Sequence, residues 1–268
     1  MRALQVNDDT TMFSSAVPIP MVGVLPVNAF LVKGEQPMLI DTGITPARDA
    51  FLTVLREHVD LADLRWLVLT HSDHDHVGAV SQLLAEAPHA RVVATFATVG
   101  IMSVGADPIP PERALVVRDG STVDVGDRTL SVHRPPLFDN PGTVAVFDPR
   151  QGVLFSADAF GGPLPTEEHA LAEDVGSLDT DEVRAAQLLW GSFDSPWVHE
   201  VEPARFGASV ARFVESKPDT VLSTHLPPIR GGLDRYVETL TMIPASAPTP
   251  LPDQEALEEF MAGFVQEL

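Results

Sequence analysis

Apolar positions in the first third of the chain switch between the period of a strand and the period of a helix. Residues 24–40 contain two β-rich runs around a Lys-Gly-Glu-Gln-Pro turn, which predicts a hairpin. Residues 46–59 carry apolar side chains at helical spacing, and 66–69 form a short apolar run typical of a buried strand. A second helix followed by a strand is predicted over 77–87 and 91–95.

The second part of the chain begins with strands and continues mainly with helices. Residues 115–133 alternate as strands punctuated by Gly120 and Gly126, and 143–155 form a hairpin interrupted by an Asp-Pro-Arg-Gln-Gly turn. Beyond this hairpin the pattern predicts helices over 181–189, 203–215 and 255–268 and one strand over 220–223. Strands with helices on both sides imply a layered α/β architecture.

The length of the chain and the scarcity of linker-like segments favour one large domain. A chain of 268 residues with 44% hydrophobic content is long enough to bury one sizeable core. Only residues 245–252, Ala-Ser-Ala-Pro-Thr-Pro-Leu-Pro, resemble a linker. We therefore expect a domain over 1–244, a linker over 245–252 and a separately docked C-terminal helix over 253–268.

Charge and cysteine content narrow the classes of partner and site. Lys plus Arg is 17 and Asp plus Glu is 38, so the net charge of −21 disfavours nucleic acid and anionic membranes as partners. The absence of cysteine leaves nitrogen and oxygen as the ligands of any metal. Neither a signal peptide nor a membrane-length apolar run is evident, so we expect a cytoplasmic protein.

The chemistry of the chain is concentrated directly after the strand predicted at 66–69. Residues 71–76, His-Ser-Asp-His-Asp-His, place three histidines and two aspartates within six positions. If the loop is extended, alternate side chains converge, so His71, Asp73 and Asp75 reach one side while His76 turns toward a neighbouring metal. The alternative is a solvated acidic loop.

This segment resembles the His-x-His-x-Asp-His signature of the metallo-β-lactamase superfamily. Three further segments support the resemblance in the expected order, namely 39–43 (Leu-Ile-Asp-Thr-Gly), 154–161 (Leu-Phe-Ser-Ala-Asp-Ala-Phe-Gly) and 223–225 (Ser-Thr-His). The resemblance covers roughly residues 20 to 230. It implies an α/β fold of layered α+β type, the metallo-β-lactamase αββα sandwich.

One departure from the signature points to a particular branch. The second histidine of the motif is Asp73 here, and a carboxylate at that place resembles the oxygen-binding diiron and flavodiiron proteins, which carry Glu there. The Asp-Ala-Phe-Gly segment that begins at Asp158 is similar to the same branch. Asp139 falls where that branch has a metal-binding histidine, which leaves three alternatives: Asp139 binds metal, the first metal lacks a protein ligand, or His133 takes the place.

The resemblance also implies a role for each residue. His71, Asp73 and Asp139 would hold a first metal, with a second metal held by Asp75, His76 and His225 and with Asp158 bridging both. Asp75 and Asp158 are the candidate catalytic residues. Asp41 is either an acceptor that orients a histidine ring or a simple turn residue, and His74 is expected to point outward.

The implied ligand set is rich in hard oxygen donors. Four carboxylates and three imidazoles suit iron better than an imidazole-dominated site does, with manganese and zinc as alternatives. Carboxylates about 4 Å apart repel by about 4 kcal/mol per pair at an effective dielectric near 20, so metal binding is expected to stabilise the protein.

Two principal functions follow from this set. The first is a nonheme diiron centre that binds or reduces dioxygen or carries out a related redox reaction. The chain ends without a flavodoxin-like domain and has no cysteine, so this function requires a separate electron donor. The alternative is a metal-dependent hydrolase that acts on an ester, lactone or phosphodiester through a metal-bridged hydroxide. A noncatalytic binding module is a third possibility, and the small-molecule substrate and oligomeric state stay open.

Overall fold

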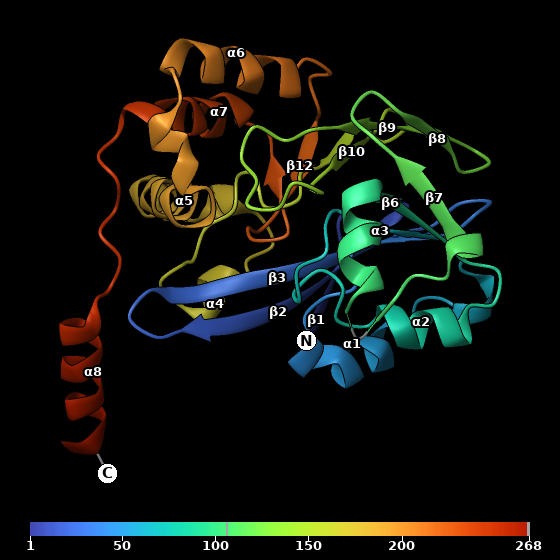
Figure 1. Ribbon diagram of the computed structural model, residues 1–268, viewed down its shortest axis with the longest axis horizontal. Helices are drawn as coiled ribbons and strands as arrows, with labels where there is room; N and C mark the ends of the chain where they lie inside the picture. Colours follow the sequence, from blue (N-terminus) through green and yellow to red (C-terminus); the bar gives the residue numbers. More distant parts are fainter. Residues whose placement is uncertain (106, 267–268) are drawn as a thin grey trace.

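The strands form two sheets stacked face to face (Figure 1). The computed structural model describes residues 1–105 and 107–266. The first sheet has the strand order β1 to β7, antiparallel from β1 to β4 and parallel from β4 to β7. Its strands are β1 (Arg2–Gln5), β2 (Thr10–Ile19), β3 (Gly23–Val32), β4 (Met38–Ile40), β5 (Trp66–Val68), β6 (Arg91–Thr95) and β7 (Ala114–Val117).

The second sheet has the order β13-β12-β11-β10-β9-β8. Its neighbouring strands pair antiparallel except β11 and β12, which run parallel. Its members are β8 (Thr122–Asp124), β9 (Thr129–His133), β10 (Ala145–Asp148), β11 (Val153–Phe155), β12 (Thr220–Leu222) and β13 (Ile229–Arg230). Both sheets therefore contain a parallel pair next to antiparallel strands.

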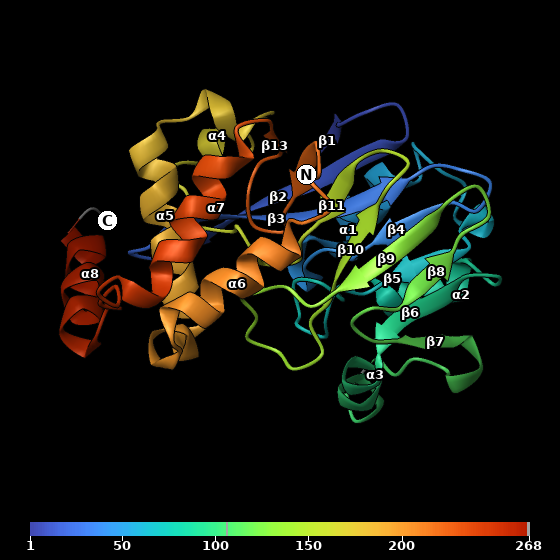
Figure 2. The same ribbon diagram turned by 90° about the horizontal axis from the view of Figure 1, so that it is seen from above.

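Helices cover the two outer faces, with α1 and α2 on one side and α5, α6 and α7 on the other (Figures 1 and 2). The α-helices are α1 (Arg48–Leu55), α2 (Val80–Glu86), α3 (Phe96–Ser103), α4 (Glu167–Ala170), α5 (Thr180–Asp194), α6 (Pro203–Phe213), α7 (Leu233–Met242) and α8 (Gln254–Gln266). Short 3-10 turns occupy Thr45–Ala47, Leu61–Asp63, Pro111–Arg113, Val175–Ser177, Pro196–Glu200 and Ile243–Ala245. In both views α8 stands at the edge of the molecule, away from the sheets.

Alternation along the strands divides the core into three layers. In the first sheet Leu39 packs under α1 and α2, whereas the next residue, Ile40, faces the second sheet. Leu154 and Phe155 divide in the same way, with Leu154 in the layer under α5, α6 and α7. Successive side chains of a strand point to opposite faces, so each buried strand supplies two layers. The predicted αββα sandwich is confirmed.

Several elements were not predicted from the sequence. Strand β2 cannot be recognised from the apolar pattern because its buried residues include polar ones, such as Ser14. The Ser14 hydroxyl donates to the Asn28 side chain at 2.6 Å. Strand β1 and helices α3 and α7 were also missed. Helix α5 runs to Asp194, beyond the predicted end at 189, and tolerates Gly191 because a Cβ there would lie 2.6 Å from Ile243. The final two residues of the helix predicted over 255–268 lie outside the described residues.

A buried ion cluster joins the rims of the two sheets around Arg128. Its guanidinium donates to Asp148 at 2.8 Å, to Asp9 at 2.8 Å and to Asp127 at 3.0 Å, and it also reaches the Lys33 carbonyl at 3.0 Å. The Arg128 and Asp148 side chains are only 2% and 1% exposed. A single cation therefore links the β1–β2 turn, the end of β3, the β8–β9 turn and β10.

Among residues 1–105 and 107–266, no helix combines the length and apolar character needed to cross a membrane.

Candidate metal centre

The polar residues singled out by the sequence follow strands whose carboxyl ends meet at one edge of the sandwich. His71, Asp158 and His225 each lie three residues beyond a strand end, after β5, β11 and β12 respectively. Asp41 follows β4 directly, and Asp139 lies in the connection from β9 to β10. The β4–β5 and β11–β12 pairs are parallel, which brings these loops together from both sheets.

The loop that carries the motif forms a tight turn. The backbone N–H of His76 donates to the Asp73 carbonyl at 2.9 Å, and that of Val77 donates to the same carbonyl at 3.1 Å. The expected alternation, with Asp75 beside His71 and Asp73, is therefore wrong. The turn carries Asp75 to the other side, where its carboxylate lies 3.4 Å from the His225 imidazole.

The turn is held against the loop after β4 by a close backbone approach. Gly78 donates its N–H to the Gly43 carbonyl at 2.8 Å. A Cβ at Gly78 would lie 2.5 Å from backbone atoms of Gly43, Ile44 and Thr45. Glycine is therefore required for the motif to sit against the Asp-Thr-Gly segment.

One cluster, called here the second group, consists of Asp75, His76, His225 and Asp158. Oδ1 of Asp158 lies 3.0 Å from Nε2 of His76 and 3.1 Å from Nε2 of His225. Asp75 Oδ1 lies 3.8 Å from Nε2 of His76. Atoms about 2.1 Å from a common octahedral ion are about 3.0 Å apart when adjacent and about 4.2 Å apart when opposite, so distances between these limits suit ligands of one cation.

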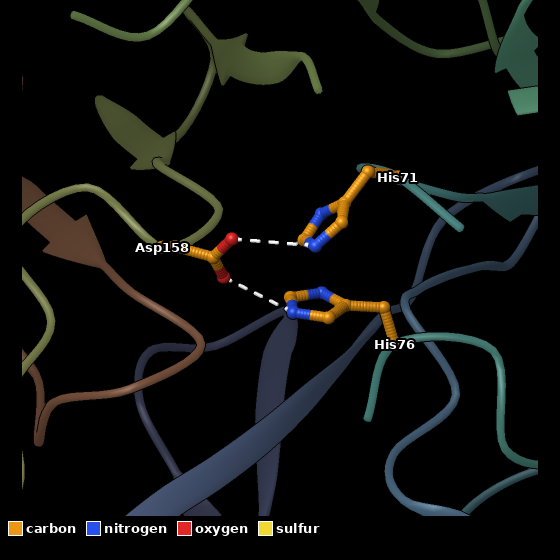
Figure 3. Close-up of side chains that lie close together, drawn as sticks. All are labelled: His71, His76 and Asp158. Atoms are coloured by element: carbon orange, nitrogen blue, oxygen red, sulfur yellow. Dashed lines mark ion pairs between the residues drawn. The ribbon is translucent and has the colours of Figure 1, made fainter. Parts of the chain in front are cut away.

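A neighbouring cluster, the first group, consists of His71, Asp73, Asp139 and Asp158. Nε2 of His71 lies 3.3 Å from Asp158 Oδ2, 3.9 Å from Asp139 Oδ1 and 4.0 Å from Asp73 Oδ2. Figure 3 shows Asp158 opposite the rings of His71 and His76, with a different oxygen directed to each. Asp158 thus stands between the two groups, as the predicted bridging role requires.

The hydrogen bonds behind the rings indicate which nitrogen faces the centre with a lone pair. Nδ1 of His225 lies 2.9 Å from the Pro26 carbonyl, and Nδ1 of His76 lies 2.8 Å from Asp41 Oδ2. Both partners only accept hydrogen bonds, so in the neutral rings Nδ1 carries the proton and Nε2 is free to bind a cation. Asp41 therefore accepts a hydrogen bond from the His76 ring, as the first of its two predicted alternatives requires.

Two atoms at the centre of the cluster lack hydrogen-bond partners among the described residues. They are Nε2 of His76 and Oδ1 of Asp158, both fully buried and 3.0 Å apart. Two acceptors that face each other at this distance are unfavourable unless a proton or a metal ion lies between them. These histidine and aspartate groups fit a dinuclear metal centre.

The pKa values of the cluster without metal are shifted because its charged groups are buried close together. Burial opposes charge on His76, but Asp158, Asp41 and Asp75 outweigh it and raise the pKa of His76 well above its ordinary value. Burial would also raise the pKa of Asp158, yet the imidazoles of His71 and His76 hold that pKa well below its ordinary value. Without metal, protons therefore supply the positive charge that this buried carboxylate needs.

Asp139 and His133, the two residues considered for the position that departs from the family pattern, lie in different surroundings. Asp139 lies in the first group, where burial and the neighbouring carboxylate of Asp73 raise its pKa to about 7. His133 instead lies on β9 with Nε2 2.8 Å from the Ser131 hydroxyl, and no metal-ligand cluster of the described residues includes it. His74 is exposed, as expected.

With this geometry established, residues 22–225 also match the family model described as Metallo-beta-lactamase superfamily. The chain belongs to the metallo-beta-lactamase superfamily. The matched range agrees with the span of roughly 20 to 230 indicated by the motifs, and the superfamily's fold accounts for the two stacked sheets.

Within the superfamily the chain resembles the flavodiiron core. It is 29% identical over 177 residues to the anaerobic nitric oxide reductase flavorubredoxin of Salmonella typhi, an alignment that covers 66% of this chain and 36% of that protein. The chain thus spans about a third of the length of this relative.

Solved structures show the same fold. Rubredoxin oxygen:oxidoreductase from Desulfovibrio gigas has a TM-score of 0.75 at 18% identity, covering 92% of this chain and 63% of that one. The flavodiiron protein from Giardia intestinalis has a TM-score of 0.72 at 18% identity, covering 91% and 58%.

Three residues near this superfamily centre were missed in the sequence. Asn140 donates its amide to Asp73 Oδ1 at 2.9 Å and so orients that carboxylate. Asp194, at the end of α5, lies within 4.8 Å of the Asp139 and Asp158 carboxylates, and Trp190 packs its ring 4.8 Å from that of His225. Asn140 follows a motif residue directly, whereas α5 was predicted to end before Asp194 and no motif marks that residue.

Substitution of Asp41 by asparagine is expected to weaken metal binding by about 10- to 100-fold, the usual effect of losing the partner of a metal-bound imidazole. Asp41 has a φ of 55°, which asparagine tolerates, so the backbone is retained. In the wild type Oδ1 accepts from the Thr70 backbone N–H, while Oδ2 accepts from the Thr70 hydroxyl and from Nδ1 of His76, and an amide with a single oxygen cannot keep all three hydrogen bonds. Anaerobic competition of Fe²⁺ between the variant and a chelator measures the change. His74→Gln, in the same loop, is the control; equal affinities in all three proteins would contradict the prediction.

Proposed function

We propose that this chain binds two iron ions and that the centre binds and reduces a small oxidant, dioxygen or nitric oxide. The observation that carries the proposal is the carboxylate-rich first group, in which Asp73 and Asp139 lie beside the single imidazole of His71. Hard oxygen donors favour iron over zinc. Similarity to flavorubredoxin and to rubredoxin oxygen:oxidoreductase supports the same chemistry.

In this proposal His71, Asp73 and Asp139 hold the first ion, with Asp158 shared between both and with Asp75, His76 and His225 on the second. When bound, two iron ions supply one-electron redox chemistry at adjacent positions. The protein residues set the geometry of these positions. The Asp41 carboxylate and the Pro26 carbonyl fix the rings of His76 and His225 before any ligand arrives.

Burial of the donors indicates from which side a small molecule would enter. The side chains of His71, His76, His225 and Asp158 are at most 2% exposed. Those of Asp73 and Asp139 are 40% and 33% exposed. The imidazole side of the centre is therefore closed to water, and we infer that the oxidant enters beside Asp73 and Asp139.

Electrons for this reaction would come from a separate donor. The 268 residues contain no cysteine and hence no metal–thiolate redox centre. The relative from Salmonella typhi is named a flavorubredoxin, and this chain covers 36% of it. We infer that a flavin or iron–sulfur donor outside these residues reduces the centre.

The function is tested by purifying the protein anaerobically, quantifying its metals and recording its visible spectrum before and after admission of dioxygen or nitric oxide. Two irons per chain, an oxidant-dependent absorption band and oxidant consumption with a chemical reductant are expected. Two zinc ions without such a band, together with turnover of an ester or lactone, would overturn the proposal and establish the hydrolytic alternative.

Replacing Asp139 with histidine is expected to move metal preference from iron toward zinc. The change exchanges one hard carboxylate for an imidazole in the first group. We expect the ratio of Zn²⁺ to Fe²⁺ affinity at one of the two positions to rise about tenfold, which corresponds to about 1.4 kcal/mol. Competition titrations of both ions measure this ratio, with Asp119→His on the exposed surface as the control. An unchanged ratio would remove Asp139 from the ligand set.

A further inference from the structure

Helix α5 presents one face to the metal centre. Gln187, Trp190 and Asp194 are three and four residues apart, the spacing that places side chains on one side of a helix. The Gln187 amide donates to the Phe160 carbonyl at 2.9 Å, two residues after Asp158. The Trp190 ring lies 4.8 Å from the ring of His225. These contacts direct the same face of the last turn, and with it Asp194, toward the candidate ligands.

Asp194 brings another carboxylate to the first group. One of its oxygens and one each from Asp139 and Asp158 all lie within 4.8 Å of one another. Its hydrogen-bond partner is the Ser195 hydroxyl, at 3.1 Å. Three carboxylates this close repel one another unless a cation or protons lie among them.

A second observation comes from the same cluster, because Oδ1 of the buried Asp158 side chain has no hydrogen-bond partner among the described residues. Trp190 is only 7% exposed, and its indole N–H also has no hydrogen-bond partner among the described residues. This group donates hydrogen bonds and does not itself bind a cation. A Cβ placed on Gly161 would lie 3.2 Å from this nitrogen and 2.7 Å from Cβ of His225. A buried donor therefore lies without an acceptor between the His225 loop and the loop after Asp158.

We propose that Asp194 is a further ligand of the first metal position, which it shares with Asp139 and Asp158. This inference rests on the proposed binding of two metals. The first position then has one imidazole, from His71, and carboxylates from Asp73, Asp139, Asp158 and Asp194. In such a set negatively charged carboxylates take the place of the histidine that the related branch has at position 139. This ligand set favours a hard, highly charged cation over zinc.

The same arrangement predicts how the two positions differ. Asp194 belongs to a cluster with Asp139 and Asp158, whereas the cluster of Asp75, His76 and His225 does not contain it. Removal of the Asp194 charge should therefore weaken metal binding at the first position and leave metal binding at the second position unchanged. A residue that only fills space at the end of α5 would affect neither position selectively.

The test compares Fe²⁺ binding to the full-length wild-type chain, Asp194→Asn and Asp194→Ser by anaerobic calorimetry and competition with a chelator. Glu200→Gln, an exposed carboxylate in the turn after α5, is the matched control. The wild type and the control should bind two ions. Both Asp194 variants should bind one ion with wild-type affinity and the other at least about tenfold more weakly.

Folding is checked separately by circular dichroism and thermal melting of the metal-free proteins. We expect Asp194→Asn to be at least as stable as the wild type without metal, because it removes a repelled carboxylate. Two ions bound by folded Asp194 variants with wild-type affinities would overturn the role of Asp194 and leave the proposed function standing. Fewer than two ions bound by the wild type would overturn both.

Discussion

Replacing Asp158 with asparagine should strongly weaken the binding of both metal ions. Its two oxygens face different groups, Oδ2 toward His71 and Oδ1 toward His76 and His225. Asparagine offers one oxygen and turns an N–H₂ group toward the other cation. Loss of one partner of a buried charge pair costs about 3–5 kcal/mol, which corresponds to a fall in affinity of about 10² to more than 10³-fold at each position.

The measurement is metal content after anaerobic reconstitution, followed by a chelator titration. His74→Gln lies in the motif loop but is exposed, so it should retain both ions. Melting of the metal-free proteins separates loss of metal from loss of fold. A folded Asp158→Asn protein that retains two ions with wild-type affinity would show that Asp158 does not bridge them.

Replacing Arg128 with methionine should lower the free energy of unfolding by about 3–5 kcal/mol, because Asp148 stays buried without its cation. For a domain of this size that corresponds to a fall in Tm of roughly 10 °C. Thermal and urea unfolding of metal-free protein measure the effect. Metal binding should be retained at temperatures where the variant is folded, because Arg128 belongs to none of the candidate metal clusters.

Two further variants test the cause. Arg150 also pairs with Asp127, but its side chain is 48% exposed, so Arg150→Met should change stability by less than about 1 kcal/mol. Adding Asp148→Asn to Arg128→Met should recover part of the loss, because the second change removes the unpaired charge. Equal effects of Arg128→Met and Arg150→Met would mean that burial of the pair is unimportant.

The sequence predicted the strands well where apolar side chains form short continuous runs or alternate with polar ones. Strands β3 to β6 and β9 to β12 agree with their predicted positions because one or both of their faces are filled by apolar side chains. Strand β2 was not predicted because it buries the polar side chains of Thr11 and Ser14. Their hydroxyls donate to Gln5 on β1 and to Asn28 on β3, so the partners that allow this burial come from the neighbouring strands. Helix α5 was predicted too short because Gly191 weakens a helix locally and is retained for packing against Ile243.

The candidate site was predictable to the extent that local motifs carry it. Each ligand predicted from the sequence sits in a segment that the motifs mark, and the structure brings all of them into two adjoining groups. The local geometry of the motif loop was not predictable, because a single turn at Asp73 decides on which side Asp75 lies. Asp194 was not predictable either, since only the docking of α5 on the second sheet places it near Asp158.

Both groups take donors from the two halves of the sandwich, with His71 and His76 following β5 of one sheet and Asp158 and His225 following strands of the other. The Asn28 amide on β3 already crosses this seam, donating to the Ser223 and Leu226 carbonyls at 2.9 Å each. Metal ions bound there would link the two sheets. Parting the sheets would therefore separate the donors of each ion and release it.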